Sequence, residues 1–358
     1  MNHVPVAGLE ELERHLRHVV DVPETPLDAK LFDEVELQLT DTNIPPLIPR
    51  LLPNLTRILL TYEQDPTILA SLSIKLIRPI QFTQVLTLAS EDALIQALRS
   101  PAPSANLLAI IILEKATRSP GDTAILSIMR GVVESFLRTW LSTPDVGVGE
   151  KATMVLGDLL EVDCDRRSSA SITTKMGGLQ LAAGMAPGQG LLWRRVFQDR
   201  EIYDAIFSLC SSTTIGTGEG QLDERQKSLA QARLLRILPR LATLDFQTIT
   251  HTKFPDIEKK YNVGQPGILY FATVDMVNKE QDMLMHITLL DLFAEFLEMM
   301  SITELTKPTM DYLAALVKKV ATSDPVMYKH LEAIAMSPET AENSPELADL
   351  LLKLNGYP

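Results

Sequence analysis

The chain has 358 residues, and its 33 basic and 46 acidic side chains give a formal net charge of −13. Proteins that neutralise nucleic-acid phosphates or lie on anionic membranes need an excess of Lys and Arg, so this balance argues against both functions. Apolar residues make up 46% of the chain but aromatic residues only 5%. Abundant leucine with few aromatic residues favours helices over sheets, in a chain apolar enough to fold.

Two cysteines, Cys164 and Cys210, are too few for a disulfide framework and predict a reducing compartment, the cytoplasm and also the nucleus. The first ten residues lack a basic segment followed by an apolar run, so we expect no secretory leader. The longest uncharged stretch, 176–193, is interrupted by glycines and a proline. It therefore does not predict a membrane helix.

Helix starts are marked where a capping Ser or Asp precedes proline. The side-chain oxygen of the Ser or Asp accepts a hydrogen bond from a backbone N–H of the first turn, which has no partner within the helix. Proline fits the first helical position because an N–H there would make no hydrogen bond within the helix. Such pairs occur at Asp65-Pro66, Ser119-Pro120, Asp324-Pro325 and Ser344-Pro345. Between them, apolar residues recur every three or four positions, which predicts amphipathic helices. We also expect the single strand-like run, 268–274, to be helical.

An internal repeat gives the fold its most specific signal. Each copy of the repeat has four positions. A leucine is followed four residues later by a second leucine, eleven residues after that by an alanine, and four residues after the alanine by a large aliphatic residue. The three copies are Leu55, Leu59, Ala70 and Ile74; Leu94, Leu98, Ala109 and Leu113; and Leu137, Leu141, Ala152 and Leu156. Successive copies are shifted by 39 and 43 residues, a period typical of HEAT and armadillo repeats.

Each copy fits a helical hairpin whose second helix carries a small residue at the close approach. A single hairpin leaves an apolar face that only the next one can cover, so the units should stack. We therefore predict an all-α fold, an α-solenoid of stacked armadillo/HEAT-like helical hairpins. Residues 1–163 would form an N-terminal helical-repeat array, 164–190 a flexible insert, and 191–358 the C-terminal half of the same solenoid. A second loop is expected at 211–220.

Catalytic signatures are weak throughout the sequence. His15 and His18 share a predicted helix face, but other residues at metal-ligand spacing are missing. Cys164 is flanked by two aspartates, which disfavour a thiolate, and Cys210 lies in an apolar segment. Residues 147–152 match a glycine-rich nucleotide fingerprint, yet they follow a predicted helix end and turn where that motif needs a strand. We expect no enzyme activity, cofactor or metal.

Charged residues are unevenly distributed. Residues 21–41 contain seven acidic side chains and one basic side chain. Conversely, Arg233, Arg236 and Arg240 fall on one helical stripe. Such stripes are usually solvated faces. Where one is functional, the net charge favours a protein partner with an acidic surface over nucleic acid.

Two strings point to a family. Residues 75–82 (KLIRPIQF), followed by 85–86 (VL) and 90–100 (SEDALIQALRS), resemble the fungal enhanced spontaneous mutability, or DNA mismatch repair, proteins. Residues 190–203 (GLLWRRVFQDREIY) add to this resemblance. It extends over about residues 45–300, whereas the C-terminal third aligns poorly. The family is similar to the animal 26S proteasome non-ATPase regulatory subunit 5.

The resemblance implies an armadillo/HEAT solenoid that acts as an assembly chaperone of the proteasome regulatory-particle base. Such a protein binds the C-terminal domain of an ATPase subunit and leaves the finished particle; we expect a monomer before binding. Second helices would line the binding groove. The partner-binding candidates are Lys75, Lys115, Lys151, Arg233 and Arg236. The alternatives are a DNA mismatch repair-associated factor and a generic solenoid scaffold or adaptor.

Overall fold

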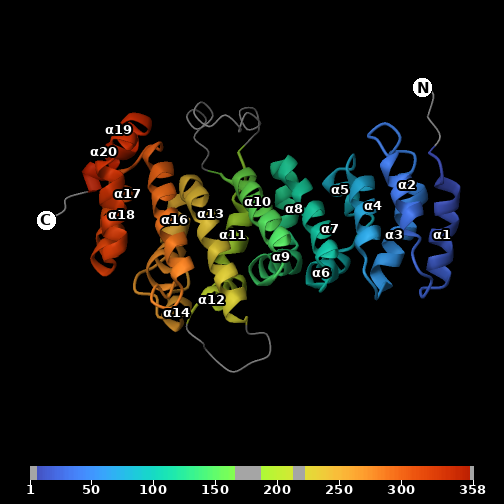
Figure 1. Ribbon diagram of the computed structural model, residues 1–358, viewed down its shortest axis with the longest axis horizontal. Coiled ribbons are helices and arrows are strands. Elements are labelled where there is room, and N and C mark those ends of the chain that lie inside the picture. Colours follow the sequence, from blue (N-terminus) through green and yellow to red (C-terminus); the bar gives the residue numbers. More distant parts are fainter. Residues whose placement is uncertain (1–5, 166–186, 213–221, 355–358) are drawn as a thin grey trace. The chain divides into compact units, whose positions relative to one another are not determined.

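The structure, a computed structural model, describes residues 6–165, 187–212 and 222–354 (Figure 1). Within these ranges every regular element is a helix and no strand occurs, which confirms the all-α class. The chain divides into two compact units, Met1–Thr139 (unit 1) and Trp140–Pro358 (unit 2). The solenoid stacking and the division at 163 and 191 stay predictions. Most of the two predicted loops, 166–186 and 213–220, lies outside the described residues.

Unit 1 consists of helices joined by short connections. Its elements are α1 (Leu9–Asp21), α2 (Ala29–Leu37), α3 (Ile48–Thr61), α4 (Thr67–Ile77), α5 (Phe82–Val85), α6 (Glu91–Arg99), α7 (Pro103–Glu114), the 3-10 helix η1 (Lys115–Arg118), α8 (Pro120–Ile128) and α9 (Arg130–Ser142). The last three residues of α9 belong to unit 2.

Capping side chains begin several of these helices, as expected. Ser119 Oγ accepts a hydrogen bond from the backbone N of Asp122, and Pro120 is the first residue of α8. The carboxylate of Asp65 instead accepts from the backbone N and the hydroxyl of Thr67. These two bonds join Asp65 to Thr67 and leave Pro66 between them as the residue before the helix. Helix α4 therefore begins at Thr67, one residue later than the Asp-Pro signal predicts.

The repeat residues lie where the hairpin interpretation places them. The leucine pairs are on α3, α6 and α9, and the small and large residues are on α4, α7 and α10 (Val146–Asp163). The three alanines, Ala70, Ala109 and Ala152, are at most 1% exposed. In unit 1, α3 packs against α4, α6 against α7, and α4 against α7 (Figure 1). The second helices of two successive hairpins are therefore neighbours.

Unit 2 begins with Trp140–Ser142 of α9 and α10. Its further elements are α11 (Leu191–Gln198), α12 (Arg200–Cys210), α13 (Glu224–Thr250), α14 (Pro255–Lys260), α15 (Ile268–Tyr270), the π-helical turn η3 (Phe271–Asp275), α16 (Met283–Ser301), α17 (Lys307–Ser323), α18 (Pro325–Met336), α19 (Pro338–Asn343) and α20 (Pro345–Leu354). The run 268–274 is helical, and α18 and α20 begin at the predicted prolines.

Helix α13 is the central element of unit 2, because it contacts α10, α12, α15 and α16. Asp245 interrupts it with non-helical backbone angles (φ −148°, ψ 81°), and its carboxylate accepts from the backbone N of Thr248. Asp245 thus caps the last part of α13. Among the described residues, no helix is both long and apolar enough to cross a membrane.

Candidate partner-binding groove

Two predicted partner-binding residues, Lys75 and Lys115, line one groove of unit 1. The groove has a volume of about 540 Å³ and lies along α4, α7 and η1, and Glu36 of α2 also lines it. We call it the basic groove. It is lined by Glu36, Ser71, Ile74, Lys75, Arg78, Ile111, Glu114, Lys115, Thr117 and Arg118.

Both lysines bond to backbone carbonyls of the preceding hairpin. Lys75 Nζ donates to the carbonyl oxygen of Glu36 (2.6 Å), in the last turn of α2. Lys115 Nζ donates to the carbonyl oxygens of Ile80 (3.0 Å) and Arg78 (3.3 Å), just after α4. Helix C-termini leave carbonyls unpaired, and their dipole favours a cation. Each lysine therefore ties its own helix to the end of an earlier one.

The environment of Lys115 is unusual for a lysine. The residue is 5% exposed. Burial, helped by the nearby Arg118 guanidinium, lowers the pKa of Lys115 from 10.5 to about 8. The two carbonyls replace part of the water that its ammonium loses. Lys115 thus has a role inside the fold and offers little charge at the surface.

The exposed cations of the basic groove are Arg78 and Arg118, which the sequence analysis missed. Each follows a groove lysine by three residues, and the two Lys-x-x-Arg segments begin 40 residues apart, one residue more than the 39-residue shift between these two copies of the repeat. Their shared spacing is the signal that could have found them. Arg78 forms an ion pair with Asp41 at 3.8 Å, but both side chains are at least 70% exposed, so the pair contributes little.

The charge of the basic groove is opposite to that of the chain. Among its described lining residues, four are basic and two are acidic, whereas the chain carries −13. Such a local excess attracts acidic surfaces and orients them on approach. The groove can therefore serve as an electrostatic docking site within a generally acidic protein.

The other three predicted residues belong to unit 2 and are not part of this groove. Lys151 is half-buried on α10. Arg236, on α13, is exposed and forms an ion pair with Glu150. Arg233, one turn earlier, is only 7% exposed and bonds to backbone carbonyls at the end of α9. Arg233 therefore fastens α13 to α9, and a role of these three residues in partner binding stays a prediction.

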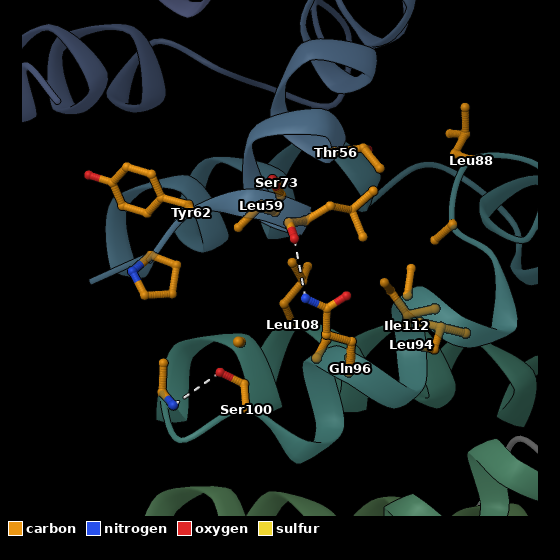
Figure 2. Close-up of a pocket in the computed structure, with 18 of the residues that line it drawn as sticks. Thr56, Leu59, Tyr62, Ser73, Leu88, Leu94, Gln96, Ser100, Leu108 and Ile112 are labelled. Atoms are coloured by element: carbon orange, nitrogen blue, oxygen red, sulfur yellow. Dashed lines mark hydrogen bonds between the residues drawn. The ribbon is translucent and has the colours of Figure 1, made fainter. Parts of the chain in front are cut away.

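Unit 1 also contains an apolar cavity of about 420 Å³, which we call the hairpin cavity (Figure 2). It is lined by side chains of α3 to α7 and their connections, among them Leu59, Leu94 and Ile112. The side-chain amide of Gln96 on α6 donates to the carbonyl oxygen of Leu60 (3.2 Å) and so links the two hairpins. The buried Ser73 of α4 also lines this cavity.

The residues weighed for catalysis have structural partners. His15 accepts from the backbone N of Asp28 (3.3 Å), and no cluster of metal-binding side chains occurs among the described residues. Cys164 Sγ donates to the Leu244 carbonyl (3.5 Å), and burial raises the pKa of the Cys210 thiol. Residues 147–152 form the start of α10, not a strand-to-helix turn. The expected lack of enzyme activity stays a prediction.

A comparison with known protein families finds a match in the N-terminal part of the chain. Residues 7–142 match the family model described as DNA mismatch repair protein HSM3, N-terminal domain. Over this range the chain is similar to the N-terminal domain of the HSM3 family. The family expected from the strings within 75–100 is thereby confirmed, whereas the string 190–203 lies outside the matched HSM3 range. A search of curated proteins found no match. The residues that line the basic groove and the hairpin cavity all lie within the matched range 7–142.

Proposed function

We propose that this protein is an assembly chaperone of the 26S proteasome regulatory-particle base. It binds the C-terminal domain of an ATPase subunit without catalysing a reaction, in the cytoplasm and nucleus, and is a monomer before it binds. The observation that carries the proposal is the basic groove, formed by adjacent second helices inside the HSM3-matched range. The similarity of this family to a proteasome regulatory subunit supplies the class of partner.

The groove supports a mechanism based on shape and charge. Lys75 and Lys115 hold α4 and the end of α7 against earlier helix ends, which fixes the groove before a partner arrives. A preformed surface binds at a lower entropic cost than one that must order. Arg78 and Arg118 then face carboxylates of the ATPase domain. While bound, the chaperone blocks other subunits from docking by steric exclusion.

Charge reversal at the two exposed arginines tests the proposal. We expect the purified full chain to bind the C-terminal domain of one proteasomal ATPase subunit in a pull-down and in calorimetry. The double variant Arg78→Glu/Arg118→Glu should weaken that binding about tenfold or more, because two attractive charges become repulsive. Both arginines are exposed, so the fold should be retained.

The matched control is Lys30→Glu/Arg57→Glu, which changes the net charge equally at exposed positions on α2 and α3, outside the groove. It should bind nearly as well as the unchanged protein. Failure of every ATPase domain to bind would refute the proposal, and capture of unrelated proteins alone would indicate a generic scaffold. Equal loss in both double variants would refute the groove as the contact surface.

A second candidate function follows from the printed family description, which names DNA mismatch repair. The net charge of −13 argues against direct DNA contact, since nonspecific affinity for DNA comes mainly from Lys and Arg at the phosphates. A repair function would then act through protein partners.

A further inference from the structure

Helix α16 of unit 2 exposes apolar side chains at its beginning. Its buried side, which includes Leu289 and Phe293, faces the core, and the helix contacts α13, α18 and α20 (Figure 1). In its first two turns Met283, Leu284 and Ile287 are each at least 48% exposed. No other stretch of five described residues exposes three large apolar side chains. Because the outer face of a packed helix is normally polar, this end of α16 has the character of a contact surface.

The same face of α16 is acidic farther along the helix. Five exposed residues, at spacings of three and four, form one stripe along it: Leu284, Ile287, Asp291, Glu295 and Glu298. We call it the α16 stripe. At 1.5 Å per residue the stripe is about 21 Å long. It thus has an apolar end and an acidic end, both on the side of the helix that no other element covers.

The carboxylates of the α16 stripe have no counter-ion. Helix α16 contains three acidic residues and no Lys or Arg. Among the described residues, the side chains of Asp291 and Glu295 form no ion pair or hydrogen bond, and Glu298 accepts one bond of 3.4 Å from a serine hydroxyl. On the neighbouring α13, Arg236 and Arg240 are already paired with carboxylates of α10. The negative charge of the stripe is therefore not neutralised within the fold.

This charge pattern disfavours several occupants. Two copies of the stripe packed antiparallel would set Asp291 against Asp291 and Glu298 against Leu284, and parallel copies would set each carboxylate against itself. Anionic lipid surfaces and nucleic acids would be repelled by the acidic end. A complementary occupant brings apolar side chains to one end of the stripe and cations to the other.

We propose that the α16 stripe binds an amphipathic helix of a protein partner, apolar at one end and rich in Lys or Arg at the other. The apolar end packs on Leu284 and Ile287, and the cations pair with Asp291 and Glu295. Helices commonly dock in this way, through side chains spaced three, four and seven residues apart. The stripe belongs to unit 2 and takes a basic partner, so the interaction does not rest on the proposed function of the basic groove.

Three labelled peptides of about 18 residues, in an alanine-rich helical background, test this partner class on the full chain. The first has two leucines and then three lysines along one helix face, and is made in both sequence directions to allow parallel or antiparallel pairing. The second has glutamates in place of the lysines, and the third has the first composition spread over all faces. By fluorescence anisotropy at about 50 mM salt, the first should bind with a Kd of about 10–100 µM. The other two should bind at least about tenfold more weakly.

Two double variants separate the ends of the stripe. Leu284→Ser/Ile287→Ser removes the apolar contact, and Asp291→Lys/Glu295→Lys reverses the charge. Each should weaken binding of the lysine peptide about tenfold or more. The charge-reversed variant should in turn bind the glutamate peptide more tightly than the unchanged protein does. All four residues are exposed, so the fold should be retained.

Matched controls carry the same changes on exposed positions of unit 1. Leu37→Ser/Ile128→Ser removes two exposed apolar side chains, and Asp33→Lys/Glu34→Lys makes the same change in net charge on α2. Both should bind the lysine peptide within about twofold of the unchanged protein, because a specific contact depends on position as well as on total charge. Equal losses in the stripe variants and in these controls would overturn the proposal.

The remaining outcomes identify other occupants. Failure of the lysine peptide to bind in either direction would overturn the proposal. A dimer of the unchanged protein that Leu284→Ser/Ile287→Ser dissociates would assign the stripe to a second copy. Binding to mixed phosphatidylcholine and phosphatidylserine vesicles that is lost in this variant would assign it to lipid, and either result would make the proposal wrong. Arg78→Glu/Arg118→Glu should leave peptide binding unchanged while it weakens binding of the ATPase domain, so the two proposals fail separately.

Discussion

Lys115 is a charged residue that is packed inside the fold, with only 5% of its surface exposed. Its ammonium is buried beside α4, and its hydrogen bonds go to the Ile80 and Arg78 carbonyls. Burial lowers the pKa of Lys115 to about 8, below the value of 10.5 for an exposed lysine. The folded protein therefore releases this proton at a lower pH than the unfolded chain does.

This difference predicts how stability depends on pH. Below about pH 8 the lysine is protonated in both states, and its burial lowers stability by a constant amount. Between about pH 8 and 10.5 the unfolded chain binds more protons, so this group makes the folded state more stable as pH rises. We expect the free energy of unfolding to rise by about 1 kcal/mol relative to Lys115→Met between about pH 7 and pH 9.

Urea denaturation of the unchanged protein and of Lys115→Met at the two pH values measures this difference. Lys75→Met is the control, because it removes an ammonium–carbonyl bond from the same groove at a half-buried site. A Lys115→Met difference that stays constant across the range would contradict the inferred shift. The range stops short of pH 10, where tyrosines with raised pKa values such as Tyr261 begin to titrate in the unfolded chain.

At the scale of elements, two glycines of α10 lie beneath two arginines of α13. A methyl group at Gly149 would overlap the guanidinium of Arg233, and one at Gly157 would overlap that of Arg240. Arg233 donates to the carbonyls of Trp140, Thr143 and Asp145 across this gap. The glycine-rich run that formally resembles a nucleotide fingerprint thus has a packing role: it lets an arginine side chain pass between two helices.

Substitutions at this crossing should be strongly coupled. Arg233→Met leaves buried carbonyls unpaired and should lower the free energy of unfolding by about 2–4 kcal/mol. Gly149→Ala displaces the same side chain and should lower it comparably. Because both changes break one set of bonds, the double variant should be much less destabilised than the sum.

The unchanged protein, the two single variants and the double variant form a double-mutant cycle. Thermal and urea unfolding of these four proteins gives the coupling energy between Gly149 and Arg233. Gly121→Ala is the control, since a methyl group there meets only ordinary contact with Ser119, and alanine favours a helix. It should leave stability unchanged or higher. Strict additivity in the cycle would show that Gly149 and Arg233 act separately, contrary to the packing seen here.

The helices and the repeat core were predictable because their signals are local. A cap such as Ser119 acts within one turn, and the 4-11-4 spacing lies within one hairpin. The Gly149–Arg233 crossing was not predictable, because it joins residues 84 positions apart whose contact depends on how α10 meets α13.

For the whole molecule, the charge distribution is more informative than the total. The chain as a whole carries a net charge of −13, whereas the basic groove has two carboxylates and four cations in one part of unit 1. Two of these, Lys75 and Lys115, are engaged with carbonyls, which leaves Arg78 and Arg118 as its exposed cations. A pair of arginines can orient one acidic protein surface, but it does not match the long phosphate track of a nucleic acid.

Salt dependence distinguishes these two kinds of partner. A DNA-binding protein that contacts many phosphates loses affinity steeply with salt, because each contact releases a counterion. We expect no binding of duplex or single-stranded DNA by the full chain at about 50 mM salt and protein concentrations up to about 100 µM. Fluorescence anisotropy with labelled oligonucleotides measures this directly.

The affinity of the unchanged protein for the ATPase domain should fall only moderately as salt rises. The affinity of the Arg78→Glu/Arg118→Glu variant should fall less with salt, because this variant lacks the two attractive charges. Tight DNA binding with a steep salt slope would instead favour direct action in repair.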